Sequence, residues 1–263
     1  MRLYCPGLPD SGTIEIQTEE VFNYAKNVLR ARSMSEVFLF DGKGKEARGV
    51  ITRIANGRLA IELRDVFKSP GKESTLRIRL LQGVLKGQKM DLVVRKATEL
   101  GVAELRPLVT EHTEVTWTRK MERWRKIGVE AARQCGRTVA PVIQESLNFR
   151  DYFKSDLPPV SEGGDVTKER GIIFWEKGGA GLKELFAKRF QGAGVQPVAS
   201  VRPEGVECVS IAIGPEGGFS ESEVSLAVDK GFCLASLGPR ILRAETAAIT
   251  AVGLVQFILG DMG

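Results

Sequence analysis

The sequence predicts an α/β protein in which a parallel sheet covered by helices follows a small β domain. Short apolar runs alternate with helical patterns from Leu76 to the end of the chain, which is typical of a parallel sheet covered on both faces. Residues 1–70 instead hold several short strand patterns and one helical pattern. Ser69-Pro70-Gly71 separates the two patterns. We therefore predict two domains, 1–70 and 71–263.

The small domain is predicted to be mainly β. Strands are expected at Val37–Phe40, Gly49–Ile54 and Arg58–Leu63. Asn56-Gly57 lies between the last two, and both residue types tolerate positive φ, so a tight hairpin is expected there. Only Glu19–Arg30 has a helical pattern. A small barrel would close so many short strands.

The second domain shows the alternation expected of a parallel sheet. Strands are predicted at Leu76–Leu81, Leu105–Val109, Ile172–Trp175, Cys208–Ile213 and Phe232–Ser236. Helices are predicted at Gln88–Leu100, Trp117–Cys135, Glu221–Lys230 and Glu245–Leu259. Two polar stretches, Asp156–Arg170 and Gln191–Glu207, are predicted loops. The last helix has so few polar residues that it is expected either in the core or against a second copy of the chain.

Charge and composition limit the function classes. The net charge is +5, and residues 72–145 carry 15 basic and 9 acidic side chains, which favours a polyanion as partner. The four cysteines have no metal-ligand spacing, and reduced thiols in a cytoplasm are the simplest explanation. No secretory signal pattern is seen in the first ten residues. The single histidine, His112, makes a His-based zinc site or a serine triad improbable, so no metal is expected.

The first motif with chemical content is a glycine-rich loop after an apolar strand. Ile211-Ala212-Ile213 leads into Gly214-Pro215-Glu216-Gly217-Gly218, and Ser220 with Glu223 forms a capping box for the next helix. Three glycines let the backbone approach a ligand closely, and ligands bind at the carboxyl ends of parallel strands. A purely structural turn is the alternative. The dinucleotide fingerprint Gly-x-Gly-x-x-Gly and a Walker A sequence are both absent.

The second motif repeats this arrangement one strand later. Ser236-Leu237-Gly238-Pro239 forms a turn after a strand, and Arg240, Arg243 and Glu245 crowd the start of the last helix. Paired arginines at a strand end suit a phosphate or a nucleobase edge. The alternative is an Arg–Glu pair that only fastens the turn.

Together these motifs resemble the ribosomal RNA small subunit methyltransferase E family, a member of the SPOUT superfamily of knotted methyltransferases. The resemblance rests on the following segments: GPEGGFS at 214–220, SLGPRILRAETAA at 236–248, LKGQKMD at 85–91, KATELGV at 96–102, EAARQCGR at 130–137, VLR at 28–30 and LFDG at 39–42. It covers nearly the whole chain. One departure is Tyr24, where the family usually has histidine.

The resemblance implies a PUA-like barrel followed by a trefoil-knot domain that binds S-adenosylmethionine. The adenine would be held by main-chain groups of 213–218 and 237–242. The cofactor-binding residues expected from the resemblance are Ile213, Gly214, Glu216, Gly217, Gly218, Leu237, Gly238, Ile241, Leu242 and Thr246. A homodimer formed through the last helix is also implied.

The product implied by the resemblance is 3-methyluridine near the 3′ end of 16S rRNA in the small ribosomal subunit. Arg240 and Arg243 are the expected stabilisers of the developing uracil charge, Glu245 would orient one of them, and Glu216 is a candidate base. Candidate RNA contacts are Arg30, Lys86, Lys89, Arg133 and Arg137. A non-catalytic RNA-binding assembly factor and a SPOUT enzyme with another RNA target are the alternatives.

Overall fold

The computed structural model describes residues 1–28, 30–68, 73–114, 120–154, 169–189 and 208–262. The chain divides into two compact units, of which the first contains Met1–Glu73 and Val129–Ala140 and the second contains Ser74–Gly128 and Pro141–Gly263. The expected loops at 156–170 and 191–207 lie almost entirely outside the described residues, as does Trp117.

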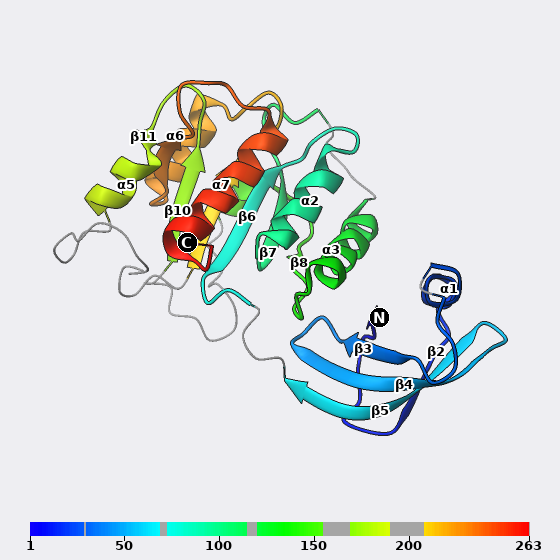
Figure 1. Ribbon diagram of the computed structural model, residues 1–263. Helices are drawn as coiled ribbons and strands as arrows, with labels where there is room; N and C mark the ends of the chain where they lie inside the picture. Colours follow the sequence, from blue (N-terminus) through cyan, green and yellow to red (C-terminus); the bar gives the residue numbers. More distant parts are fainter. Residues whose placement is uncertain (29, 69–72, 115–119, 155–168, 190–207, 263) are drawn as a thin grey trace. The chain divides into compact units, whose positions relative to one another are not determined.

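The first unit is built on a five-stranded sheet with the order β1-β3-β4-β5-β2. Its strands are β1 (Arg2–Tyr4), β2 (Thr13–Ile16), β3 (Glu36–Phe40), β4 (Lys45–Ala55) and β5 (Arg58–Lys68) (Figure 1). Asn56 and Gly57 both have positive φ, 52° and 73°, which confirms the predicted hairpin. Alternate residues of β3 and β4 point inward, so Val37, Leu39 and Ile51 are fully buried in the core of the unit.

The helix predicted over Glu19–Arg30 is shorter and changes its form. Only α1 (Glu19–Asn23) is α-helical, and Tyr24–Val28 forms a π-helical turn. The backbone N–H of Ala31 donates to the carbonyl of Ala25 at 2.9 Å, a wide turn that takes the chain out of the helix. Arg30 therefore lies outside the helix with φ 49°.

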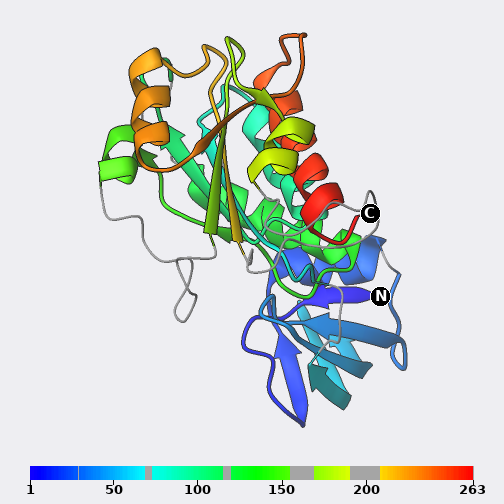
Figure 2. The ribbon, with the colours of Figure 1, turned by 90° about the vertical axis from the view of Figure 1, so that its left-hand side faces the viewer.

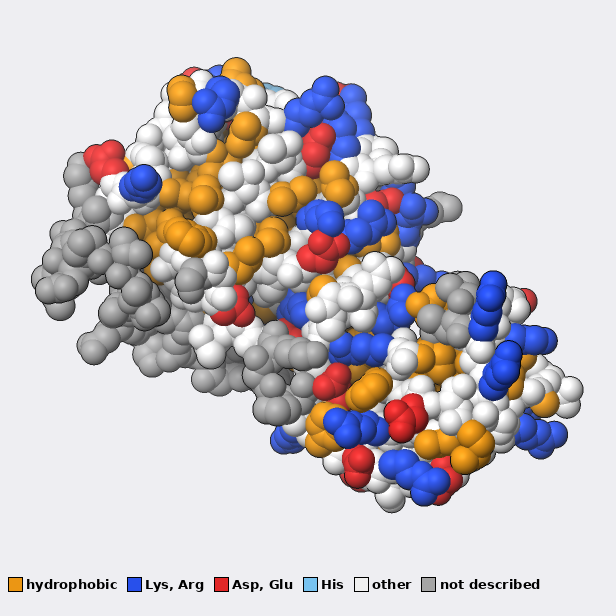
Figure 3. Space-filling view, viewed as in Figure 1, with side chains coloured by type: hydrophobic (Ala, Val, Ile, Leu, Met, Phe, Trp, Pro, Cys, Tyr) orange, Lys and Arg blue, Asp and Glu red, His pale blue; other side chains and the backbone are white. Residues whose placement is uncertain are grey.

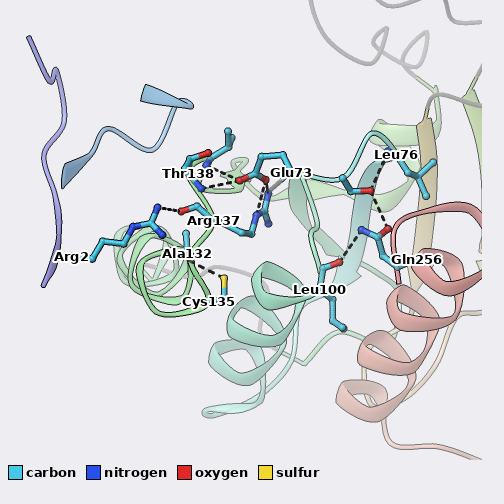
Figure 4. A network of polar contacts seen from close by, with 11 residues as sticks. Arg2, Glu73, Leu76, Leu100, Ala132, Cys135, Arg137, Thr138 and Gln256 are labelled. Atoms are coloured by element: carbon cyan, nitrogen blue, oxygen red, sulfur yellow. Dashed lines mark hydrogen bonds and ion pairs between the residues drawn. The ribbon is translucent and has the colours of Figure 1, made fainter. Parts of the chain in front are cut away.

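The segment Val129–Ala140 belongs to the first unit because Glu73 fastens it there. The Glu73 carboxylate accepts hydrogen bonds from the backbone of Thr138 and Val139 and from the Arg137 guanidinium, all at 2.9–3.0 Å. Arg2 donates to the Arg137 carbonyl at 2.7 Å (Figure 4). The sequence-based division had assigned this segment to the second domain.

The second unit is an α/β fold with an eight-stranded sheet in which every pairing is parallel. The order is β11-β13-β10-β12-β6-β7-β8, and β9 pairs with β7. The strands are β6 (Arg77–Gly83), β7 (Glu104–Val109), β8 (Val142–Ile143), β9 (Leu147–Asn148), β10 (Glu169–Phe174), β11 (Ala180–Gly181), β12 (Cys208–Ile213) and β13 (Cys233–Ser236). This confirms the predicted fold class. Central strand β12 is buried at all six positions, as expected for a sheet covered on both faces.

Helices cover both faces of the sheet. One face carries α4 (Phe149–Lys154) and α6 (Glu221–Asp229), and the other carries α2 (Lys89–Glu99), α5 (Leu182–Arg189) and α7 (Ala244–Leu259) (Figure 2). The remaining helix, α3 (Met121–Cys135), contributes residues to both units. The capping box predicted for α6 is present, with Ser220 and Glu223 bonded reciprocally.

Buried Gln256 ties the C-terminal helix to its neighbour. Its amide donates to the carbonyl of Leu100 at 3.0 Å and accepts from the Ser74 hydroxyl at 3.2 Å (Figure 4). Gly101 has φ 85° and follows the C-terminus of α2, as predicted. A Cβ at this position would lie 2.6 Å from the Gln256 amide nitrogen. Among the described residues no helix is long and apolar enough to cross a bilayer.

Candidate functional site

The two predicted motifs meet in one cavity of about 480 Å³ at the carboxyl ends of β10, β12 and β13. Because neighbouring parallel strands end at the same edge, their following loops converge there. The lining residues are Lys89, Phe174, Trp175, Glu176, Ile213, Gly214, Pro215, Glu216, Gly217, Gly218, Phe219, Ser236, Leu237, Gly238, Arg240, Ile241, Leu242, Arg243, Ala244, Glu245 and Ala247.

The glycine loop, residues 214–219, is a tight turn pressed against neighbouring backbone. The Gly218 N–H donates to the Pro215 carbonyl at 3.0 Å, and Gly218 has φ 71°, a conformation that favours glycine. Fully buried Gln82 donates its amide N–H to the carbonyls of Gly83 (3.0 Å) and Gly214 (3.3 Å). A Cβ on Gly83 would lie 2.5 Å from the Pro215 nitrogen. The loop position therefore depends on glycine in β6 as well as in the loop.

Glu216 is held by the segment that precedes α2. Its Oε1 accepts from the Lys86 backbone N–H at 3.1 Å and from the Lys89 ammonium at 2.9 Å. Partial burial alone would raise the pKa of Glu216, but the Lys89 hydrogen bond, backbone hydrogen bonds and the Lys89 charge outweigh it and lower the pKa below its ordinary value. An ionised, paired carboxylate of low pKa is a weak proton acceptor, so this geometry favours a fastening role over a base.

Side chains from two further strand ends contact the glycine loop. The Trp175 indole donates to the Phe219 carbonyl at 3.2 Å. His112 Nδ1 lies 3.3 Å from the Gly218 carbonyl oxygen. Glu176 faces Gly218 so closely that a Cβ built there would be 2.8 Å from its Oε1. The glycine loop is therefore contacted by residues that follow β7 and β10.

The second wall, residues 237–243, has few such contacts. Within it, the Ser236 hydroxyl pairs with the backbone of Gly238 at 3.2 and 3.3 Å. Ile241 is 83% exposed, and Arg240 and Arg243 are exposed as well. Glu245, in the first turn of α7, has a buried Oε2 that receives no hydrogen bond. Among the described residues Glu245 forms no ion pair with either arginine, so the predicted Arg–Glu pairing is absent.

The cavity contains every sequence-predicted cofactor residue except Thr246. In a helix each residue turns by about 100° from the one before, so Thr246 points away while Ala244, Glu245 and Ala247 line the cavity. All four candidate catalytic residues, Arg240, Arg243, Glu245 and Glu216, are part of the lining. As cavity residues, sequence reasoning missed Phe174, Trp175 and Ser236, and it had named Lys89 only as a candidate RNA contact. Only their positions at predicted strand and helix ends could have indicated a place in the cavity.

The candidate RNA contacts mostly have partners inside the protein. In the second unit, Lys86 pairs with Glu114 and Lys89 with Glu216. In the first unit, Arg137 is buried against Glu73. Arg133 donates to the Tyr24 hydroxyl at 2.8 Å, lies 4.4 Å from that ring's centre and pairs with Glu130. Arg30 is exposed. The guanidinium–ring contact gives Tyr24, the departure from the family pattern, a structural role.

Comparison with known proteins finds similarity to RNA methyltransferases in both parts of the chain. Residues 72–256 match the model of an RNA methyltransferase domain, and residues 18–64 match an RNA methyltransferase PUA domain. The chain is 31% identical to the ribosomal RNA small subunit methyltransferase E of Synechocystis (94% of this chain, 74% of the relative). It is 28% identical to that of Rickettsia conorii (95% and 92%).

Solved structures are similar over the whole chain. A Legionella pneumophila methyltransferase in complex with the cofactor SAM is 32% identical with a TM-score of 0.80, covering 99% of this chain and 98% of the other. A ribosomal RNA small subunit methyltransferase E from Neisseria gonorrhoeae, bound to S-adenosyl methionine, is 28% identical with a TM-score of 0.81, covering 100% and 99%.

Proposed function

The chain belongs to the ribosomal RNA small subunit methyltransferase E family, and from this premise we propose that it methylates N3 of a uridine near the 3′ end of 16S rRNA with S-adenosylmethionine as methyl donor. The observation that carries this proposal is the joining of the glycine loop and residues 237–243 into one cavity. We assign RNA binding to residues 1–70 and catalysis to 71–263. The RNA methyltransferase and PUA matches support this division.

The residues of the cavity fit S-adenosylmethionine. Its volume of about 480 Å³ is within the usual range of small-molecule sites. The main chain of the glycine loop and of Leu237–Gly238 offers donors and acceptors of the kind an adenine edge requires, and Ile213, Ile241 and Leu242 offer apolar surface. The unpaired oxygen of Glu245 suits a positively charged ligand. When bound, the cofactor supplies an electrophilic methyl group on a sulfonium.

Uracil imposes its own requirements on the protein. Its N3–H normally lies in the base-pairing edge, so the base must be exposed or flipped out. As N3 gives up its proton and attacks the methyl carbon, negative charge spreads to O2 and O4. Arg240 and Arg243, exposed at the cavity wall and free of ion pairs among the described residues, are placed to stabilise that charge. The low pKa of Glu216 makes it a poor acceptor for the N3 proton.

The location and partners follow from the same family membership. We propose action in the cytoplasm on rRNA within the small subunit, through the first unit and the basic middle of the chain. We also propose a homodimer through α7, since Figure 3 shows apolar side chains gathered over this helix and Leu254, Phe257 and Met262 are 39%, 61% and 51% exposed. Light scattering at micromolar concentration that finds only a monomer would overturn the dimer.

Mass mapping of rRNA from a strain that lacks this protein tests the function. We expect one methylated uridine near the 3′ end of 16S rRNA to become unmodified and to be restored by the wild-type gene. Arg240→Ala should restore it poorly, because losing one charge-stabilising donor costs about 10²-fold in rate. Normal methylation by this variant would remove Arg240 from the mechanism. Loss of a methyl group at another RNA position would indicate a different target, and RNA binding without S-adenosylmethionine binding would indicate an assembly factor.

A further inference from the structure

Three carboxylates line the cavity, and they differ in how the protein neutralises them. Glu216 is bonded to Lys89 and to the Lys86 backbone. Glu176 and Glu245 form no ion pair and receive no hydrogen bond among the described residues. The cavity thus holds one carboxylate with an internal partner and two without.

Glu176 lies on the side of the glycine loop. Its carboxylate faces Gly218, with Oε1 and Oε2 at 2.8 and 3.1 Å from the position of a Cβ there. The neighbouring Lys177 does not neutralise it, because the Lys177 ammonium lies over the Trp175 ring, 5.6 Å from its centre. Glu176 is therefore an exposed carboxylate in the cavity lining, next to the glycine loop.

Glu245 lies on the opposite side, in the first turn of α7. A buried carboxylate oxygen without a donor is unfavourable. The N-terminal end of a helix stabilises a nearby negative charge, which explains why a glutamate is tolerated here, but it gives Oε2 no hydrogen-bond partner. Arg240 and Arg243, the nearest cations along the chain, are exposed and unpaired with it. A cation that enters the cavity would compensate Glu245.

We propose that Glu176 and Glu245 act as a charge selector, which makes the cavity prefer the sulfonium of the methyl donor to the neutral thioether that remains after transfer. The inference rests on the proposed function. Donor and thioether product differ by one methyl group and one positive charge, and their adenosine and amino-acid parts are the same. Glu245, with its buried oxygen, and the exposed Glu176 both act on that charge. Of the cations in the lining, Lys89 is already paired with Glu216, and Arg240 and Arg243 are exposed to solvent, which screens them. The selector favours release of the product.

Titration calorimetry with three ligands tests the selector without any turnover. The ligands are S-adenosylmethionine, S-adenosylhomocysteine, and sinefungin, which carries a protonated amine near the sulfonium position. We expect the wild type to bind both charged ligands about tenfold or more tightly than S-adenosylhomocysteine, equivalent to about 1.4 kcal/mol. Glu176→Gln and Glu245→Gln, which keep shape and remove charge, should each weaken the charged ligands about tenfold and leave S-adenosylhomocysteine within twofold.

The neutral ligand also reports whether each variant is folded, since retained S-adenosylhomocysteine affinity requires an intact cavity. Glu216→Gln is the matched control, and its effect should be equal for all three ligands because Glu216 already has an internal cation. Equal losses for charged and neutral ligands in the Glu176 and Glu245 variants would overturn the selector, as would equal affinities in the wild type. Wild-type protein that binds none of the three would overturn the proposed function itself.

Discussion

The two walls of the cavity are built in opposite ways. The glycine loop is held by Gln82, Lys86, Lys89 and Trp175, all from elements distant in sequence. Residues 237–243 hold themselves mainly through the Ser236–Gly238 turn. The first wall is therefore ordered before any ligand binds, and the conformational entropy of the loop is lost during folding rather than on binding. The second wall has exposed apolar and basic side chains that would gain contacts only when a ligand binds.

This difference gives each wall its own experimental signature. Changes at the first wall should lower both the stability of the free protein and its affinity for S-adenosylmethionine. Changes at the second wall should lower affinity or rate and leave the free protein unaltered.

Gly83→Ala should have the largest effect. Its Cβ would lie 2.5 Å from backbone of Pro215, which cannot move aside like a flexible side chain. Overpacking of this kind costs about 1–3 kcal/mol, and we expect the upper part of that range together with a large loss of S-adenosylmethionine affinity. Thermal unfolding measures the loss of stability, and calorimetry measures the loss of S-adenosylmethionine affinity. Gly178→Ala is the control, because its Cβ would meet open space and its φ is outside the left-handed region; an equal loss of stability in both variants would show that the Gly83 effect does not come from the contact with Pro215.

Gln82→Leu should lower the free energy of unfolding by less, about 1–2 kcal/mol. The change removes the amide N–H groups that donate to two buried carbonyls, and it keeps the side-chain volume. A buried acceptor left without a donor costs about 1–3 kcal/mol. This loss of stability is partly offset, because the Gln82 Oε1 that is also removed has no hydrogen-bond partner. Urea unfolding gives the stability change, and amide exchange near the loop should accelerate. A variant as stable as the wild type would show that Gln82 does not hold the loop.

Glu216→Gln should cost under about 1 kcal/mol, because its ion pair with Lys89 is partly exposed. The pKa of Glu216 is lowered, so its contribution is present above the ordinary glutamate pKa and is lost as pH falls through the lowered value. Melting temperatures of wild type and variant should therefore differ at pH 7 and converge well below pH 4, in the acidic range set by ordinary glutamate titration near 4.3. A constant difference across pH would contradict the ion-pair explanation.

Ile241→Ser should leave stability within about 0.5 kcal/mol, since Ile241 is 83% exposed. Burying an isoleucine side chain against a ligand contributes about 1.5–3 kcal/mol, so S-adenosylmethionine affinity should still fall about tenfold. Calorimetry beside thermal unfolding separates the two quantities. An unchanged affinity would show that this wall does not close on the cofactor.

Features that depend on nearby residues could be predicted from the sequence. The Asn56-Gly57 hairpin, the Ser220–Glu223 capping box and the end of α2 at Gly101 each rest on backbone preferences within a few positions. The parallel fold class followed from the alternation of strand and helix patterns. The shortened first helix was not predicted, because its wide turn at Ala25 and Ala31 depends on packing within the unit.

The sequence by itself determined the two glycine-bearing turns and the polar residues that follow them. Only the tertiary structure decided which of those residues have partners. Glu216 is paired because α2 begins beside its loop, Arg133 and Arg137 are used inside the first unit, and Glu176 and Glu245 are left unpaired in the cavity. The physical reason is range: backbone preferences act over a few residues, whereas ion pairs and burial depend on strand order and on chain segments more than a hundred residues apart.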